Sequence, residues 1–223
     1  LTLLSTTIPF LDPETDKVFV VLVAKIDDAS YRQSCVTVAH LFESLSETGN
    51  FKRSELIHRR SCFPAVNVGT SYGQGSKKPA NLRHHDPVLV ERLLQDKDVQ
   101  HLATYGSYSF LLWVPYVYTY YKDRLDSLFK RMPQLQRNFG KSMFPRAAFN
   151  FGSQVCTVNH HDCMNCPFGW CTIHALGEFN HRMGGHLVLP DLKLVIEFPP
   201  RAVVLMPSAT LTHSNTKVSN GET

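Results

Sequence analysis

Apolar positions in the first 146 residues follow two different periods. Residues 17–26 form a β-branched, apolar run, which predicts a buried strand. Residues 30–47 carry apolar side chains at helical spacing, which predicts an amphipathic helix. Asp86 followed by Pro87 predicts the start of another helix, because Asp is a favoured N-cap and Pro fits the first helical turn.

Two further segments of this half have distinct patterns. A stripe of apolar and aromatic side chains predicts a long helix over residues 110–132. Pro115 should either bend this helix or mark the position at which it starts. Residues 69–78 are rich in Gly and Ser, which predicts a surface loop. They lack the Gly-Lys-Ser/Thr end of a phosphate-binding P-loop at the required spacing.

The pattern changes after residue 146, where short β-rich segments alternate with turn residues. These segments cover residues 147–151, 154–158, 170–176, 186–189, 192–198 and 202–206. Closely spaced short strands are typical of an antiparallel sandwich or jelly roll. We therefore expect an α+β fold in one domain over residues 1–223. Residues 1–146 would supply mostly helical support and basic loops, and residues 147–223 the β core.

Composition narrows the functional classes. The chain has 223 residues, of which 43% are hydrophobic and 19% charged, as in globular proteins. No apolar run approaches the ~20 residues that a membrane helix needs, so we expect no membrane partner. Six cysteines in a chain with no secretory pattern predict reduced thiols in the cytosol or nucleus.

Positive charge is concentrated in two segments. Residues 51–83 carry seven Lys or Arg against the single acid Glu55, and residues 131–146 carry four with no acid. Clusters of this kind bind polyanions such as nucleic acid. A solvated surface explains the charge alone equally well.

A pattern of metal ligands stands out in the second half. His160 and Asp162 end a predicted strand, and His213 follows a later one. Residues i and i+2 of an extended chain point the same way, so His160 and Asp162 can bind one metal while His161 points away. Two His and one carboxylate leave positions open for substrate and oxygen, as in non-haem Fe(II) oxygenases. His-x-Asp is a weak motif by itself, and its weight comes from the surrounding strands.

A second set of metal ligands overlaps the first. Cys163, Cys166, Cys171 and His174 have the number and spacing of zinc ligands. If residues 170–176 form a strand, however, Cys171 and His174 face opposite sides, which does not suit one tetrahedral site. Structural or incidental cysteines are therefore favoured. A non-catalytic, zinc-dependent nucleic-acid binding module stays open as an alternative.

Many short motifs occur in an order typical of one family. They cover residues 149–152, 160–162, 168–171, 184–189, 191–200, 207–209 and 213–215, with upstream matches at 67–73 and 79–82. On these motifs, residues 65–223 resemble the TET/JBP family of Fe(II)/2-oxoglutarate-dependent dioxygenases, in particular its fungal branch associated with mobile elements. Residues 1–60 match only loosely.

The resemblance implies a double-stranded β-helix (jelly-roll) core buttressed by helices from the N-terminal half. It implies Fe(II), the cosubstrate 2-oxoglutarate and O2, with the iron ligands at His160, Asp162 and His213. The implied reaction oxidises the methyl group of 5-methylcytosine in DNA to hydroxymethyl, formyl and carboxyl forms, after the base has flipped out of the duplex. We expect a nuclear monomer. N6-methyladenine or methylated RNA as substrate, and protein hydroxylation, stay open.

The resemblance also points to residues beyond the iron ligands. Asn165 falls where some relatives contact the base with a carboxylate; unlike a carboxylate, an amide both donates and accepts. Asn150 is a candidate contact to cosubstrate or base, and equally a strand-end amide. In the family a basic residue after the last His, usually Arg, holds the distal carboxylate of 2-oxoglutarate; here Lys217 is the only basic residue after His213.

The basic segments supply the expected contacts to nucleic acid. We expect phosphates to be held by four side chains from these segments, namely Lys77, Lys78, Arg83 and Arg146.

Overall fold

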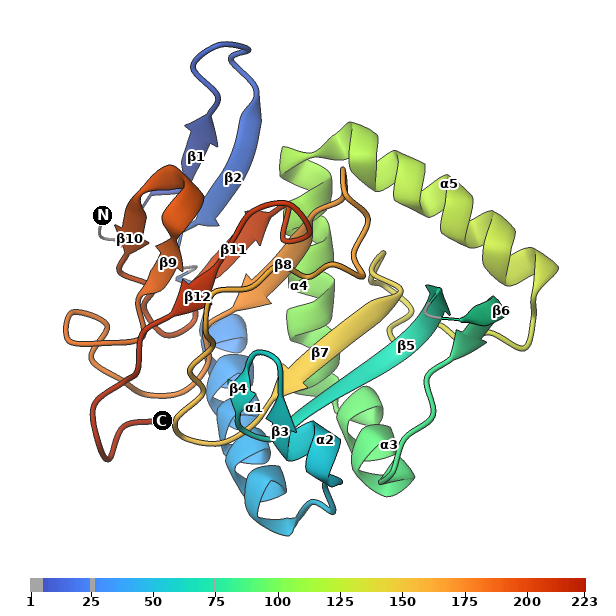
Figure 1. The fold of residues 1–223 in the computed structure, drawn as a ribbon, viewed down its shortest axis with the longest axis horizontal. Helices are drawn as coiled ribbons and strands as arrows, with labels where there is room; N and C mark the ends of the chain where they lie inside the picture. The colour runs from blue at the N-terminus through green and yellow to red at the C-terminus, as the bar shows by residue number, and fades with distance from the viewer. Residues whose placement is uncertain (1–5, 25–26, 74) are drawn as a thin grey trace.

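The computed structural model of the chain describes residues 6–24, 27–73 and 75–223. Figure 1 shows a mixed α/β structure in which helices and several small sheets pack together. All strand pairs among the described residues are antiparallel. Antiparallel pairing accords with the sequence prediction, while the jelly-roll topology stays an expectation.

The largest sheet has the order β1-β2-β11-β8, formed by β1 (Ile8–Leu11), β2 (Val18–Val23), β11 (Val203–Met206) and β8 (Cys171–His174). The side chains of β2 alternate between two apolar clusters: Val21 and Val23 belong to one, Val20 and Leu22 to the other. Because both faces of the sheet are covered, β2 is apolar at every position rather than at every second one.

A smaller sheet covers one face, with β9 (Leu187–Leu189) between β10 (Leu194–Ile196) and β12 (Ser214–Asn215). A single 3-10 turn, η1 (Pro190–Leu192), joins β9 to β10. Leu187, Leu189 and Ile196 pack in the same buried cluster as Val20 and Leu22 of the larger sheet. The two sheets therefore share an apolar layer.

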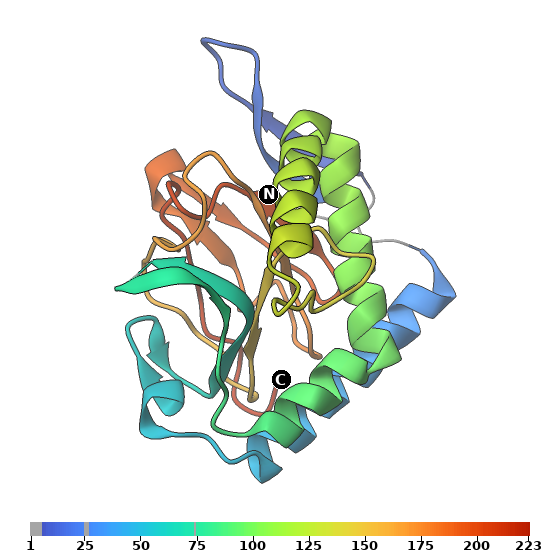
Figure 2. The same ribbon diagram turned by 90° about the vertical axis from the view of Figure 1, so that its right-hand side faces the viewer.

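Helices cover the opposite face, where α1 (Ala29–Thr48), α3 (Pro87–Gln95) and α4 (Lys97–Trp113) bury apolar side chains against the sheet. Figure 2 shows them as a layer along one side of the strands. Asp28 and Asp86 cap α1 and α3, each accepting a hydrogen bond from the backbone N–H three residues later. The last long helix, α5 (Pro115–Arg131), has no fully buried residue.

A third sheet, ordered β6-β5-β7, extends this half of the molecule. Its strands are β6 (Ser76–Asn81), β5 (Ala65–Gly73) and β7 (Arg146–Asn150), with Ala65 paired to Asn150 and Gly69 to Arg146. Before it come α2 (Arg53–Leu56) and a short hairpin, β3 (Ile57–His58) and β4 (Ser61–Cys62). Among the described residues before β7, the chain thus forms six strands in addition to its helices.

Most sequence predictions of elements are confirmed. The strand over residues 17–26 is β2, although Lys25 and Ile26 lie outside the described residues. The helix over residues 30–47 is α1, and Asp86 caps α3 as expected. Pro115 does not bend one helix but begins α5, directly after α4. The segments 147–151, 170–176, 186–189, 192–198 and 202–206 each contain a strand.

Two predictions were wrong. Residues 69–78 are not a loop: except for Gln74, which is not described, they belong mainly to β5 and β6 or the turn between them. Positive φ angles at Gly69 and Gly73 permit the irregular register of this hairpin. Residues 154–158 do not form a strand, because the side chain of Asn215 bonds the backbone at Val155 and Thr157 in place of a neighbouring strand.

Candidate metal centre and its cavity

The two histidines of the predicted triad lie on paired backbone segments. His160 and His213 form an isolated antiparallel bridge in which each N–H donates to the other carbonyl at 3.1 Å. Side chains of directly opposed residues lie on the same face of such a pair. The imidazole centroids are accordingly only 4.2 Å apart.

Asp162 joins the two imidazoles. Its backbone N–H donates to the carbonyl of Ser208 at 2.8 Å, which holds the residue beside the bridge. Its carboxylate oxygens lie 3.9 Å from Nε2 of His160 and 3.8 Å from Nε2 of His213. One possible ligand atom from each residue lies within 4.8 Å of the others.

Hydrogen bonds fix which nitrogen of each imidazole is free. Nδ1 of His160 lies 2.8 Å from the carbonyl of Val158, and Nδ1 of His213 lies 3.0 Å from the carbonyl of Leu211. A carbonyl oxygen only accepts, so both Nδ1 atoms must donate, and each Nε2 of a neutral ring keeps its lone pair. Burial lowers the pKa of His160, which favours the neutral ring. Two such nitrogens and a carboxylate fit a divalent first-row metal such as Fe(II).

His161 lies outside this cluster. It is exposed, and its Nε2 lies 3.0 Å from Oγ1 of Thr212. The structure therefore separates His161 from His160 and Asp162 as the alternation of an extended chain predicts.

A cavity of about 850 Å³ adjoins the triad. It is lined by all three triad residues and by both asparagines singled out in the sequence, Asn150 and Asn165. Nδ2 of Asn165 donates to Oγ of the buried Ser208 at 2.9 Å, and the backbone N–H of Asn165 donates to the carbonyl of Asp162 at 2.8 Å. Asn165 thus supports the metal-site turn and also faces the cavity.

The predicted phosphate contacts lie at different depths. Arg146 lines the cavity and is partly buried; burial lowers the pKa of its guanidinium, and the Asp162 carboxylate opposes the shift. Arg83 also lines the cavity but is exposed. Lys77 and Lys78 are exposed on β6, away from the cavity lining.

Lys217, the predicted contact to the cosubstrate, is exposed and does not line the cavity. Its backbone carbonyl instead accepts a hydrogen bond from the N–H of Gly185. Nothing in its surroundings directs its ammonium group toward the triad.

The cysteines of the alternative zinc site point in different directions. Cys171 packs in the apolar cluster between the two sheets, whereas His174 faces the helices, with Nδ1 3.4 Å from the Tyr31 hydroxyl. Cys163 is exposed. Within the described part of the chain, three potential metal ligands converge only at His160, Asp162 and His213.

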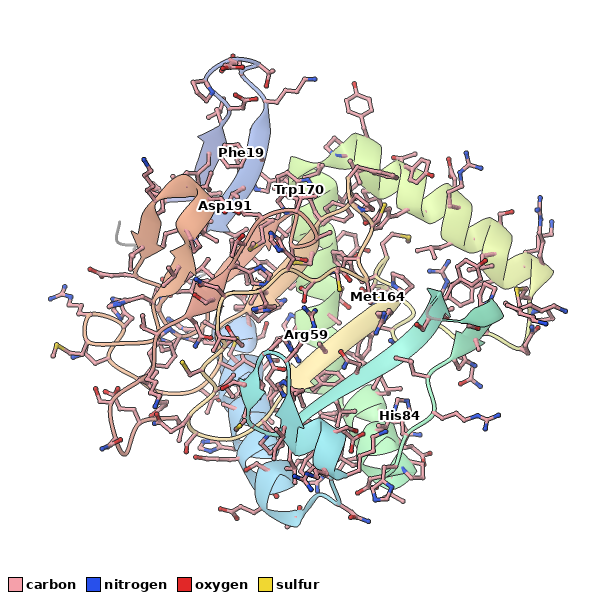
Figure 3. The ribbon with its side chains drawn as sticks, viewed as in Figure 1. Phe19, Arg59, His84, Met164, Trp170 and Asp191 are labelled. Atoms are coloured by element: carbon pink, nitrogen blue, oxygen red, sulfur yellow. The ribbon has the colours of Figure 1, made fainter. Side chains whose placement is uncertain are left out.

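Two cavity residues were not singled out from the sequence. Arg59 and Arg60 form the tip of the β3–β4 hairpin, and both line the cavity. Nη2 of Arg59 lies 4.0 Å from the Asp162 carboxylate, and Figure 3 shows this side chain over the central strands. Nη2 of Arg60 donates to Oδ1 of Asn150 at 3.1 Å. The only sequence signal was two adjacent arginines in a basic segment.

Comparison with known proteins identifies the fold. The chain matches no family model and no curated protein. It does match a solved structure described as NgTET1 in complex with 5mC DNA, with a TM-score of 0.68 and 16% sequence identity, over 94% of this chain and 70% of that one.

The chain has a TET-like fold. The likeness covers 94% of the chain, which is more than the part from residue 65 onward that carries the sequence motifs. At this level of identity it establishes the architecture, in which the His-Asp-His cluster is a possible iron site. None of the described helices has the length and apolar content that crossing a membrane requires.

Proposed function

We propose that this protein is an Fe(II)/2-oxoglutarate-dependent dioxygenase that oxidises the methyl group of 5-methylcytosine in DNA. The observation that carries the proposal is the cluster of His160, Asp162 and His213 on the wall of a large cavity, within a TET-like fold. The matched NgTET1 structure contains 5mC DNA, which favours this substrate class for a protein of the same architecture.

The triad residues fit iron chemically. In the neutral form of each histidine the lone pair lies on Nε2, because Nδ1 donates to a backbone carbonyl. Three protein ligands leave coordination positions free. Bound Fe(II) would supply, with O2 and 2-oxoglutarate, the oxidising chemistry that removes hydrogen from a methyl group. The protein's part is to hold these ligands in place and to keep their rings neutral.

The size and charge of the cavity suit both a dicarboxylate cosubstrate and part of a nucleic acid. Its volume of about 850 Å³ lies within the range of small-molecule sites, roughly 300–1,000 Å³. The residues that line it include five basic side chains, Lys52, Arg59, Arg60, Arg83 and Arg146, against three carboxylates, Glu43, Glu55 and Asp162. Such an excess of positive charge favours a dicarboxylate cosubstrate and the phosphates of a nucleic acid.

The target base would reach the cavity by leaving the duplex, which costs a few kcal/mol. Exposed apolar side chains at Met164 and Phe168, directly after the iron ligand Asp162, could contact the opened stack. Asn165 would contact the Watson–Crick edge of the flipped base. Lys77 and Lys78, outside the cavity, and the exposed Arg83 on its lining would contact phosphates.

The proposal includes further expectations taken from the sequence. The chain would form one dioxygenase domain with a jelly-roll core, act as a monomer in the nucleus, and belong to the fungal branch. The alternative substrates are N6-methyladenine and methylated RNA, both of which can also present a flipped base. The alternative without catalysis is a zinc-dependent nucleic-acid binding module.

Metal content and product analysis test the proposal together. Protein purified without added metal would be loaded with Fe(II), then incubated with 2-oxoglutarate and duplex DNA containing 5-methylcytosine. Mass spectrometry of the nucleosides should detect hydroxymethylcytosine, and the amount of succinate should rise together with the amount of oxidised base. The matched variants are His160→Ala, which should be inactive, and His161→Ala, which should stay active. Tightly held zinc without turnover would instead favour the binding module.

A further inference from the structure

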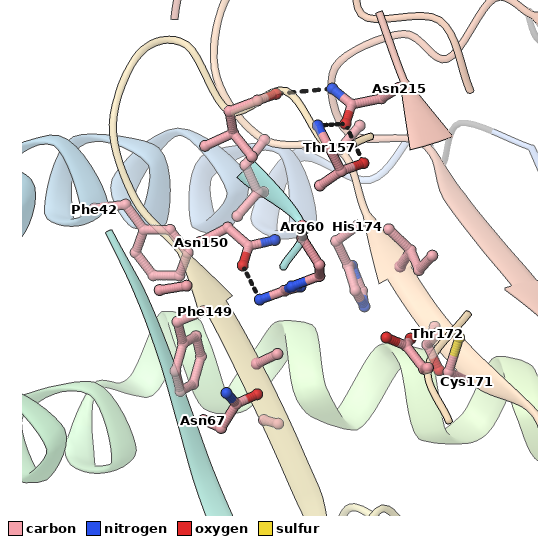
Figure 4. A pocket seen from close by; sticks show the side chains of 18 of the residues that line it. Phe42, Arg60, Asn67, Phe149, Asn150, Thr157, Cys171, Thr172, His174 and Asn215 are labelled. Atoms are coloured by element: carbon pink, nitrogen blue, oxygen red, sulfur yellow. Dashed lines mark hydrogen bonds between the residues drawn. The ribbon is translucent and has the colours of Figure 1, made fainter. Parts of the chain in front are cut away.

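Arg60 occupies an unusual position among the basic residues of the cavity. It lies at the tip of the β3–β4 hairpin, far in sequence from the triad. Figure 4 shows its side chain extending toward Asn150 in the cavity, where Nη2 donates to Oδ1 of Asn150 at 3.1 Å. A guanidinium has five N–H donors, so most of them are left for another acceptor.

The charge of Arg60 has no carboxylate partner. Among the described residues, no Asp or Glu oxygen lies within ion-pair distance of its guanidinium. Its other close neighbour is the Phe63 ring, whose centroid lies 5.9 Å from Cζ of Arg60. Burial lowers the pKa of Arg60, although a guanidinium stays charged at any ordinary pH. A partly buried cation whose partner is neutral is an incomplete ion pair.

The charge of Arg60 is also felt at the metal site. Arg60 lines the same cavity as His160, Asp162 and His213, and the Asp162 carboxylate is the nearby charge that favours the charged form of its guanidinium. An anion bound to Arg60 would therefore lie within electrostatic range of the iron ligands.

The other three arginines of the cavity are placed differently, and Arg83 is exposed. The Arg59 side chain is 56% exposed and already faces the Asp162 carboxylate at 4.0 Å. Arg146 begins β7, at the opposite end of that strand from Asn150. Arg60 combines burial, an amide that fixes its orientation, and free donors.

We propose that Arg60 holds a carboxylate of the 2-oxoglutarate cosubstrate and that Asn150 is a positioning residue for its guanidinium. The planar fork of Arg matches a carboxylate bidentately, and the hydrogen bond to Asn150 limits its rotation. A DNA phosphate is the other possible source of the anion. The burial of Arg60 favours the small free dicarboxylate, whereas the more exposed Arg59 suits a phosphate.

The test measures ligand binding separately from turnover. Under anaerobic conditions, calorimetry and the visible charge-transfer absorption of the Fe(II)–2-oxoglutarate complex would report cosubstrate binding to iron-loaded protein. Arg60→Ala should raise the Kd for 2-oxoglutarate by at least ~10-fold, as expected for a lost charged hydrogen bond. Arg60→Lys should restore part of the affinity. Asn150→Ala should weaken binding less than Arg60→Ala does.

Two controls separate the possible outcomes. Arg53→Ala changes an exposed arginine of the same basic segment outside the cavity lining and should leave the Kd for 2-oxoglutarate unchanged. Iron content and methylated-DNA affinity of Arg60→Ala should equal those of the unmodified protein. If Arg60→Ala lowers DNA affinity and leaves cosubstrate binding intact, the anion is a phosphate and the assignment is wrong. Arg60→Gln serves the same measurements if Arg60→Ala does not fold.

Because this assignment rests on the proposed function, its failure must be separable from failure of that function. Unmodified protein that binds iron but no 2-oxoglutarate would overturn both. Unmodified protein that binds 2-oxoglutarate, with an Arg60→Ala variant that binds it equally well, would overturn only the assignment to Arg60.

Discussion

The backbones of His160 and His213 are hydrogen-bonded to each other in both directions, so their imidazoles are aligned by the chain itself. Each ring is further fixed by a bond from Nδ1 to a carbonyl two residues earlier, at Val158 or Leu211. The side chains of both histidines are only 6% exposed. The two histidines of the candidate metal site are therefore oriented by hydrogen bonds within the chain.

Removal of a triad side chain should abolish metal binding. We predict that His160→Ala, Asp162→Ala or His213→Ala lowers Fe(II) affinity beyond the ~10–100-fold typical of residues that only support a ligand, and abolishes turnover. DNA affinity should change little. His161→Ala is the matched control, because His161 contacts Thr212 outside the cluster. An inactive His161→Ala together with an active His160→Ala would show that the ligand assignment is wrong.

Two exposed lysines of β6, Lys77 and Lys78, and Arg83 just after that strand should bind DNA phosphates. Replacing Lys77, Lys78 and Arg83 by Ala should weaken DNA binding and reduce the slope of log K against log salt by roughly 0.9 for each phosphate that is no longer neutralised. Lys17→Ala is the control, since Lys17 is exposed beside the β1–β2 turn, distant from β6 (Figure 1). An unchanged slope in the triple variant would mean that these residues are only solvated.

Asn165 should affect both stability and substrate choice. Asn165→Ala removes the donor to the buried Ser208 hydroxyl, so the free energy of unfolding should fall by about 1–3 kcal/mol. Asn165→Asp can keep this bond with Ser208 as the donor, while it presents only acceptors to a base. We predict that Asn165→Asp changes the ratio of activities on 5-methylcytosine and N6-methyladenine. An unaltered ratio in both variants, with a lower Tm for Asn165→Ala, would restrict Asn165 to a structural role.

A substitution that usually stabilises helices should destabilise this one. Gly→Ala inside a helix commonly gains ~1 kcal/mol. A Cβ at Gly106 in α4, however, would lie 2.9 Å from Nε2 of His174 and from Cγ2 of Thr172. Gly106→Ala should therefore lower Tm, because overpacking costs typically ~1–3 kcal/mol. Adding His174→Ala should recover part of the loss, and a double-mutant cycle by urea unfolding would measure this coupling.

The buried imidazole of His174 should make stability depend on pH. Burial lowers its pKa to about 4, from about 6.5 in an unfolded chain. Above pH 6.5 the ring is neutral in both states. Between pH 6.5 and 4 only the unfolded chain takes up the proton, so stability falls as pH falls, by at most about 3 kcal/mol and by less where cavity water reaches the ring. Urea unfolding of His174→Gln should show a flatter profile; equal slopes would contradict the shift.

Local patterns were sufficient for much of the fold and for the triad. The Asp86 cap was predicted, and the break before Pro115 was one of the two outcomes expected there; both depend on chemistry within one helical turn. His160 and Asp162 were paired by the alternation of an extended chain, which needs no tertiary information. His213 was found through its place after a late strand and through the family resemblance.

Contacts between segments that are far apart in the sequence could not be predicted from such local patterns. The Gly-rich β5 is a strand because β7, more than seventy residues later, pairs with it. Gly69 is required there, since a Cβ would lie only 2.1 Å from the carbonyl oxygen of Pro145. Arg60 reaches the cavity only because a two-stranded hairpin turns it toward Asn150. Conversely, residues 154–158 have strand-like composition, but the side chain of Asn215 makes the hydrogen bonds to their backbone that a neighbouring strand would make.

The bridge between His160 and His213 also restricts the conformational entropy of the chain between them. It joins the ends of the segment from residue 160 to residue 213, and a cross-link over a loop of this length corresponds to roughly 4 kcal/mol of chain entropy. Since folding has already closed this loop, metal binding need not do so. The free energy of metal coordination would then go into holding the ion and not into ordering the chain between the two histidines.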